Sequence, residues 1–195
     1  MKNRIITISR EFGSGGRTIG KLAAERLNIP CYDQELIERF SKESGFSKEF
    51  VAERGEDAPY GSWFANALST QAIQGGTSPQ DFLWAVQQHV ILDLAEKGPC
   101  VIVGRCADYI LRDVADCLTV FVHASLEKRA ERIVKLYGER EDTPIKRLKD
   151  KDKRRAAYYK LYTDTEWGEM RHYHITLDSG VLGVETCAGI IAQLF

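Results

Sequence analysis

Short apolar runs alternate with segments of helical periodicity along most of the chain. Strand-like runs, several of them rich in β-branched residues, occupy 5–8, 29–32, 100–103, 118–123 and 173–177. Between these runs apolar residues recur every three or four positions, which predicts helices. The helical segments are 19–27, one that begins near 36, then 82–94, 126–137, 145–161 and 184–194. Strands that alternate with helices indicate an α/β protein whose parallel sheet is covered on both faces.

One segment interrupts this alternation. Residues 45–80 lack a clear period and carry turn signals such as Gly55, Pro59 and Gly75. We therefore expect an inserted helical subdomain there, within one domain that spans 1–195. Ligands of parallel sheets bind at the carboxyl ends of the strands. This edge is predicted to gather four groups of residues: 9–18, Asp33, 104–105 and 123–125.

The segment EFGSGGRT, residues 11–18, lies between the first strand and the first helix. Backbone N–H groups of a glycine-rich loop and the positive end of a helix together bind phosphate oxygens. Against the phosphate-loop pattern GxxxxGK[ST], Gly16 matches the second glycine and Thr18 the hydroxyl that meets magnesium. Glu11 occupies the first glycine position, and Arg17 occupies the lysine position. Arginine adds a forked, permanently charged donor.

Two other interpretations of this loop stay open. Gly13 and Gly15 also fit the dinucleotide pattern GxGxxG, with Asp33 about 20 residues later, although Thr18 replaces its third glycine. Alternatively, the glycines serve only the geometry of a tight turn.

Composition is that of an ordinary soluble globular protein, with 44% hydrophobic and 28% charged residues. The five cysteines form no CxxC pair, which favours reduced thiols over a disulfide framework or a zinc site. The apolar run before Ser9 is too short for a signal sequence or a membrane span. We expect a cytoplasmic protein without a membrane partner.

Positive charge is concentrated in one part of the chain. Residues 125–160 hold 13 Lys and Arg against 7 Asp and Glu, although the whole chain has a net charge of −1. A pI near 6.4 argues against a stable nucleic-acid partner, so the local field suits a phosphate pocket better. The sequence leaves the oligomeric state open.

Five segments together resemble the cytidylate kinase-like family, relatives of the bacterial CMP kinases, over nearly the whole chain. They are ISREFGSGG with the following Ile19–Gly20 step, YDQELIER, VIVGRCADYIL, HASLEKRAERI and KDKDKRRAAYYKLYT. The resemblance implies a P-loop NTPase-type three-layer α/β/α fold with a parallel sheet, the helical insert at 45–80 and a basic lid helix within 139–168. It also implies ATP-dependent phosphoryl transfer with Mg²⁺ to a nucleoside monophosphate, expected to be CMP or dCMP.

The resemblance assigns roles residue by residue. Donor binding falls to Gly13, Ser14, Gly15, Gly16, Arg17 and Thr18, with Thr18 also a metal ligand. Acceptor binding falls to Asp33, Arg39, Arg105 and Asp152. The resemblance also implies that four arginines stabilise the charge on the phosphoryl group during transfer: Arg17, Arg129, Arg132 and Arg155. The chain departs from CMP kinases at Gln34, Glu35 and Glu38, and Cys106 replaces the aspartate of their GRD segment.

Each assignment has a plainer alternative. Asp33 also suits the N-cap of the following helix, and Arg129 and Arg132 could pair with nearby glutamates on the surface. The charged run 146–160 is also typical of a solvated helix face. At the level of function, a small-metabolite kinase on the same core and a catalytically weak, nucleotide-binding regulatory protein are the two alternatives.

Overall fold

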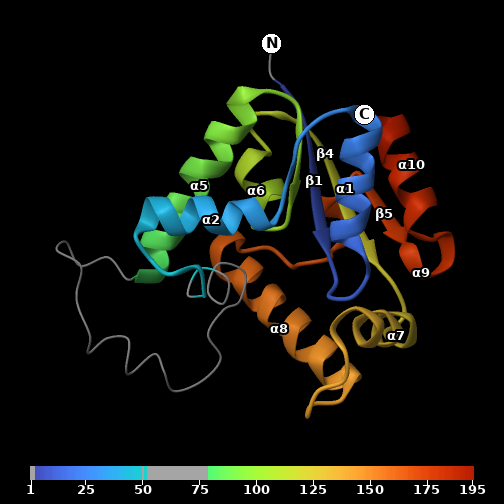
Figure 1. The fold of residues 1–195 in the computed structure, drawn as a ribbon. Helices are drawn as coiled ribbons and strands as arrows, with labels where there is room; N and C mark the ends of the chain where they lie inside the picture. The colour runs from blue at the N-terminus through green and yellow to red at the C-terminus, as the bar shows by residue number, and fades with distance from the viewer. Residues whose placement is uncertain (1–2, 50, 52–78) are drawn as a thin grey trace.

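The computed structural model describes residues 3–49, 51 and 79–195, and a parallel sheet forms its centre (Figure 1). Within these residues five strands lie in the order β2-β3-β1-β4-β5, and every pair of neighbours is parallel. The strands are β1 Arg4–Arg10, β2 Cys31–Tyr32, β3 Cys100–Val103, β4 Asp116–His123 and β5 Ile175–Asp178. The predicted parallel sheet is confirmed. The insert expected at 45–80 falls mainly on residues 50 and 52–78, outside the described part.

Helices cover both faces of the sheet (Figure 1). One face carries α1 (Gly16–Leu27) and α10 (Val184–Leu194). The other carries α2 (Gln34–Ser44), α5 (Pro79–Lys97) and α6 (Ala107–Leu111). The remaining elements are α7 Leu126–Tyr137, α8 Pro144–Thr163, the 3-10 helix η1 Met170–His172 and α9 Ser179–Leu182. None of the described helices combines the length and apolarity that a membrane span requires.

Strand β1 is the central strand, and six of its seven residues are buried. Its side chains alternate between two cores, as expected for a strand covered on both faces. Ile6 and Ile8 pack in the core under α1 and α10, whereas Ile5 packs in the core under α2 and α5. Because both faces of β1 are buried, apolar residues occupy nearly every position of this strand in the sequence.

The strands are added to the sheet first on one side of β1 and then on the other. After β1 the chain crosses through α1 to β2 at one edge, returns to β3 beside β1, and then continues to β4 on the other side of β1. Such a change of side opens a crevice at the carboxyl ends of the strands, where ligands of α/β proteins bind. The loop between β1 and α1 lies at this crevice.

A third, smaller core anchors the C-terminal half of α8 beside α6. Tyr158 and Tyr159 pack there with Cys106, and Trp84 stacks on Tyr162 with ring centroids 4.4 Å apart. The Tyr159 hydroxyl donates a hydrogen bond of 2.8 Å to the Asp108 carboxyl group. Burial raises the pKa of Asp108, although the Tyr159 hydrogen bond opposes this shift. The C-terminal half of α8 is thus held beside α6, and the helix also packs against α7 and borders the crevice.

Candidate active site at the carboxyl edge of the sheet

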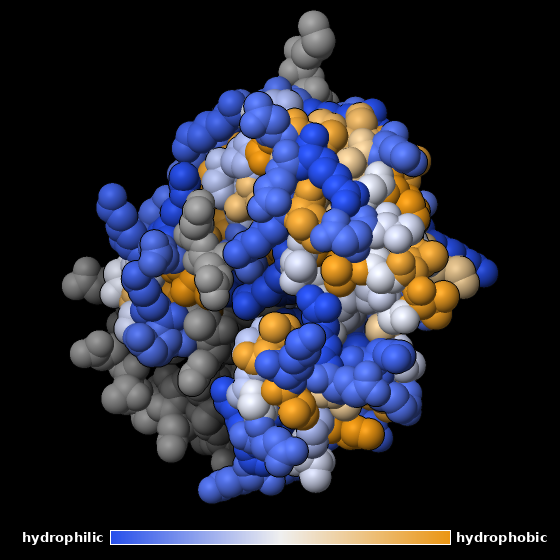
Figure 2. Space-filling model, turned by 45° about the vertical axis from the view of Figure 1, so that its right-hand side comes forward, coloured by the Kyte–Doolittle hydropathy of each residue, from blue (hydrophilic) through white to orange (hydrophobic). Residues whose placement is uncertain are grey.

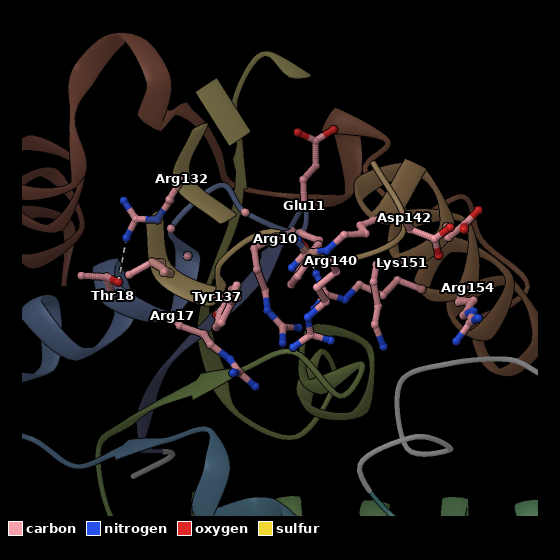
Figure 3. A pocket seen from close by; sticks show the side chains of 18 of the residues that line it. Arg10, Glu11, Arg17, Thr18, Arg132, Tyr137, Arg140, Asp142, Lys151 and Arg154 are labelled. Carbon is pink, nitrogen blue, oxygen red and sulfur yellow. Dashed lines mark hydrogen bonds between the residues drawn. The ribbon is translucent and has the colours of Figure 1, made fainter. Parts of the chain in front are cut away.

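A cavity of about 730 Å³ lies at this crevice between the β1–α1 loop, α7 and α8 (Figure 3). This volume is within the usual range for small-molecule sites. Figure 2 shows a hollow near the middle of one face of the molecule, bordered mainly by hydrophilic residues. Among the described lining residues, nine are basic and four acidic, so the cavity attracts anions. The basic residues are Arg10, Arg17, Arg105, Arg132, Arg140, Arg147, Lys151, Arg154 and Arg155.

Two glycines shape the loop that forms one wall of the cavity. Gly13 and Gly15 have φ values of 81° and 86°, a region that residues with a Cβ rarely adopt. A Cβ on Gly13 would also lie 2.9 Å from Ile133 Cγ2 and 3.0 Å from the Arg129 carbonyl oxygen. Gly15 is the N-cap of α1 and provides no side-chain cap, so the N–H groups of the first turn are available to an anion. The loop therefore fits a polyphosphate.

Glu11 anchors this loop to β4. Its N–H donates to the Val122 carbonyl oxygen at 3.0 Å, and its Oε2 accepts from the Ala124 N–H at 3.2 Å. Arg129 Nε lies 3.3 Å from the same oxygen. Burial raises the pKa of Glu11, and Arg129 partly offsets the shift. In Figure 3 the side chain points away from the open cavity, in keeping with a structural role.

Arg129 and Asp152 lie behind the loop. Both are largely buried, and within the described structure neither lines the cavity. The Phe12 N–H donates to Asp152 Oδ1 at 2.7 Å, and Arg129 Nη1 donates to the Phe12 carbonyl oxygen at 3.2 Å. The structure thus brings these two predicted site residues together as partners of the loop backbone. Their predicted contacts with substrate stay predictions.

Arg132 and Thr18 face each other across the cavity wall, joined by a hydrogen bond from Arg132 Nη2 to Thr18 Oγ1 of 2.9 Å (Figure 3). A magnesium ion at Thr18 would require Arg132 to release this oxygen. The described residues contain no cluster of three or more His, Cys, Asp or Glu side chains suited to a metal. Magnesium commonly keeps several waters and binds through substrate phosphates, so the site suits a metal that arrives with its nucleotide.

Arg17 and Asp33 form an ion pair, with 3.1 Å between Nε and Oδ2. The Asp33 side chain is only 6% exposed, whereas that of Arg17 is 43% exposed and lines the cavity. Asp33 stands at the N-cap position of α2, but its side chain makes no capping hydrogen bond. The pair therefore links the loop helix α1 to the start of α2, on the side where the acceptor was predicted.

The turn after β3 brings Arg105 into the cavity wall. Arg105 and Cys106 have φ values of 61° and 54°, and non-glycine residues held in this region often mark functional sites. The Gln87 side chain donates to the Arg105 carbonyl oxygen at 2.9 Å and fixes the turn. Arg155 also lines the cavity. Arg39, by contrast, lies over the Tyr32 ring and is not among the described lining residues.

Sequence reasoning gave no role to three basic residues that line the cavity: Arg10, Arg140 and Arg147. Arg140 and Arg147 lie in and after the connection between α7 and α8, within the basic stretch 125–160 that already indicated a phosphate pocket. Arg10 ends β1 and was not assigned a role, because the phosphate-loop match that takes Gly16 as the second glycine begins at Glu11. It is only 5% exposed and lines the cavity.

Two solved kinases share this fold. Shikimate kinase from Acinetobacter baumannii, determined with shikimate, matches with a TM-score of 0.56 at 15% identity, covering 98% of this chain and 92% of that one. A gluconokinase from Sinorhizobium meliloti matches with a TM-score of 0.53 at 16% identity, covering 99% and 94%. The fold is therefore that of the small P-loop kinases.

Sequence similarity gives the family. The model of the cytidylate kinase-like family matches residues 5–181. The cytidylate kinase of Methanocaldococcus jannaschii is 25% identical, over 97% of this chain and 96% of that protein. An uncharacterized protein from Eubacterium ventriosum has a TM-score of 0.71 at 30% identity, covering 97% and 96%. The chain belongs to the cytidylate kinase-like family, and it is a kinase.

Proposed function

We propose that the protein transfers the γ-phosphate of ATP, bound with Mg²⁺, to a nucleoside monophosphate, with CMP or dCMP as the expected acceptor. The observation that carries this proposal is the charge of the cavity, whose described lining holds nine basic and only four acidic residues. A neutral acceptor would need few of these cations. Two phosphate-bearing substrates that meet in one cavity account for the excess.

The donor side is the loop from Gly13 to Thr18. Left-handed glycines bring main-chain N–H groups close to a bound polyphosphate, and the start of α1 adds its positive end. These donors are fixed before substrate arrives, because the loop is tied to β4 through Glu11 and to α8 through Asp152. Preorganised donors stabilise a phosphoryl group during transfer without reorganisation.

The acceptor side includes Arg105 from the β3–α6 turn and Arg155 from α8, which line the same cavity. A planar guanidinium can donate two hydrogen bonds to one phosphate group. In the proposed step an oxygen of the acceptor phosphate forms a bond to the γ-phosphorus. The bond from that phosphorus to the bridging oxygen breaks, and its electron pair leaves with ADP. The region 139–168, which holds most of α8, is proposed to act as the lid.

A coupled ADP-release assay tests the proposal with CMP, dCMP, the other nucleoside monophosphates, cytidine, shikimate and gluconate as acceptors. We expect turnover with CMP or dCMP and none with cytidine, which lacks the phosphate. Turnover with shikimate or gluconate alone would instead identify a small-metabolite kinase. ATP binding without turnover of any acceptor would identify a nucleotide-binding regulatory protein. Arg105→Gln should raise the KM for CMP by about tenfold or more, whereas Arg112→Gln, outside the cavity lining, is the matched control.

A further inference from the structure

Gly16 is a glycine because of Arg10. Gly16 is the first residue of α1, and it lacks the positive φ of Gly13 and Gly15. Its backbone would therefore accept any residue that a helix accepts. A Cβ at Gly16, however, would lie 2.6 Å from Arg10 Cβ and 2.8 Å from Arg10 Cγ. Because these atoms lie at the root of the Arg10 side chain, they cannot move aside easily. The stem of Arg10 occupies the space that a side chain at Gly16 would fill.

This contact favours a second way of aligning the chain with the phosphate-loop pattern. If the second glycine of GxxxxGK[ST] is Gly15 rather than Gly16, the first glycine position falls on Arg10 and the lysine position on Gly16. Gly15 suits the second glycine, because it has a left-handed φ and is the N-cap immediately before the helix. In this register the chain departs from the pattern at three positions, because Arg17 also takes the place of the serine or threonine. The departures at Arg10 and Gly16 are complementary. An arginine stands where the pattern has glycine, and a glycine stands where it has lysine.

Arg10 is placed to act on phosphate. It is only 5% exposed, and its side chain points into the pocket in the same direction as those of Arg17 and Arg140 (Figure 3). Arg10, Arg105 and Arg155 also border a small recess of about 20 Å³ beside the main cavity. No carboxylate is among the described residues that line this recess. Arg155 Nη1 donates to the Arg10 carbonyl oxygen at 3.1 Å, which fixes the end of β1.

We propose that Arg10 supplies the cation that the phosphate-loop lysine supplies in the standard pattern. The absence of a side chain at Gly16 leaves room for the Arg10 side chain to reach the cavity. The proposal rests on the proposed ATP-dependent function. Arg10 would donate two N–H groups to oxygens of the β- and γ-phosphates and stabilise the charge that builds up there during transfer. The guanidinium keeps its protons throughout, so the bonds made and broken are those of the transfer step itself. Arg17 is then a positioning residue through its pair with Asp33.

Exchange of the two residues is the sharpest test. Arg10→Gly should lower kcat by about 100-fold or more, the usual effect of removing one donor to a transition-state anion. Gly16→Lys alone should also be impaired, because its Cβ meets the Arg10 stem. The double variant Arg10→Gly/Gly16→Lys restores the glycine and the lysine of the standard pattern and should recover at least tenfold in kcat over Arg10→Gly. Thermal unfolding establishes that each variant is folded, and Arg10→Lys keeps a charged stem and should retain intermediate activity.

A binding measurement separates this inference from the proposed function. Calorimetric titration with ATP and with AMP should show that Arg10→Gly loses at least tenfold in affinity for ATP but little for AMP, since only ATP has β- and γ-phosphates. This readout holds even if the wild-type protein turns over no acceptor, in which case only the proposed function fails. The inference is overturned if Arg10→Gly keeps its ATP affinity, if the double variant is no better than Arg10→Gly, or if Arg17→Ala shows the larger loss of ATP affinity and kcat.

Discussion

Arg129 and Asp152 hold one peptide group of the phosphate loop between them. The guanidinium Nη1 lies 2.5 Å from Asp152 Oδ2, and the two side chains bind the carbonyl oxygen and the N–H group of Phe12 respectively. Arg129 belongs to α7 and Asp152 to α8, so the pair joins two helices and the loop at one buried point. The shape of the loop therefore depends on a pair that lies behind it.

Arg129→Ala should lower the free energy of unfolding by about 3–5 kcal/mol, because it leaves Asp152 and Glu11 without their buried counter-charge. Chemical denaturation measures the loss. Asp142→Asn is the matched control, since Asp142 pairs with Lys146 on the surface and its loss should have little measurable effect on stability. Equal effects from the two variants would show that the buried pair does not hold the fold together.

Gly13→Ala should abolish the thermal stabilisation that ATP gives to the protein. Besides the unfavourable φ, the added Cβ meets Ile133 and the Arg129 carbonyl oxygen, so the loop must shift out of its phosphate-binding shape. Gly45→Ala is a closely matched control, because Gly45 has a φ of 74° but no atom within 4 Å of an added Cβ. Both variants should lose about 1 kcal/mol or more of stability. Only Gly45→Ala should keep the ATP response.

Glu11 should make stability depend on pH in an unusual direction for a carboxyl group. Its pKa is raised above the ordinary value of 4.5 in the folded protein, chiefly by burial. Between these two pKa values the folded state binds more protons than the unfolded state, so the contribution of Glu11 to stability falls as pH rises. Wild type should therefore lose stability relative to Glu11→Gln as pH is raised from about 4 towards 7. Parallel unfolding curves, or a relative gain by wild type, would refute this.

Tyr159→Phe should destabilise the protein by about 1–3 kcal/mol, because it removes the side-chain donor that hydrogen-bonds to the buried Asp108 carboxyl group. Thermal unfolding at neutral pH measures the effect. Tyr109→Phe removes a hydroxyl from the neighbouring ring that stacks with Arg112, and serves as the control. If both variants unfold at the wild-type temperature, the link between α6 and α8 contributes nothing to stability.

Much of the fold could be predicted from the hydrophobic pattern. The strand 100–103 and the helix 184–194 have the bounds that their apolar runs indicated. The second strand is shorter than the predicted 29–32, although the Pro30 carbonyl oxygen still accepts a hydrogen bond from the Val101 N–H. Helices α6 and α9 were not predicted, because segments of five and four residues are too short to show a helical period.

The position of the site could also be predicted, but the partners of its charged residues could not. Motif matching named Arg129 and Asp152, yet it gave no sign that they bind the Phe12 peptide group from behind. Arg10 falls within the segment 9–18 predicted at this edge, but no pattern gave it a role, and its relation to Gly16 depends on an approach of 2.6 Å that only coordinates reveal. Spacing along a sequence predicts which residues gather at one edge of a sheet; it does not predict which charges satisfy one another.

Phosphorus NMR of the protein with Mg²⁺, ATP and CMP tests the central claim most directly, because it follows the transferred group itself. The account predicts that the γ-phosphate signal of ATP decays as the β-phosphate signal of CDP grows at the same rate. Appearance of the lost phosphate as inorganic phosphate, or an unchanged spectrum with every nucleoside monophosphate tried, would contradict it.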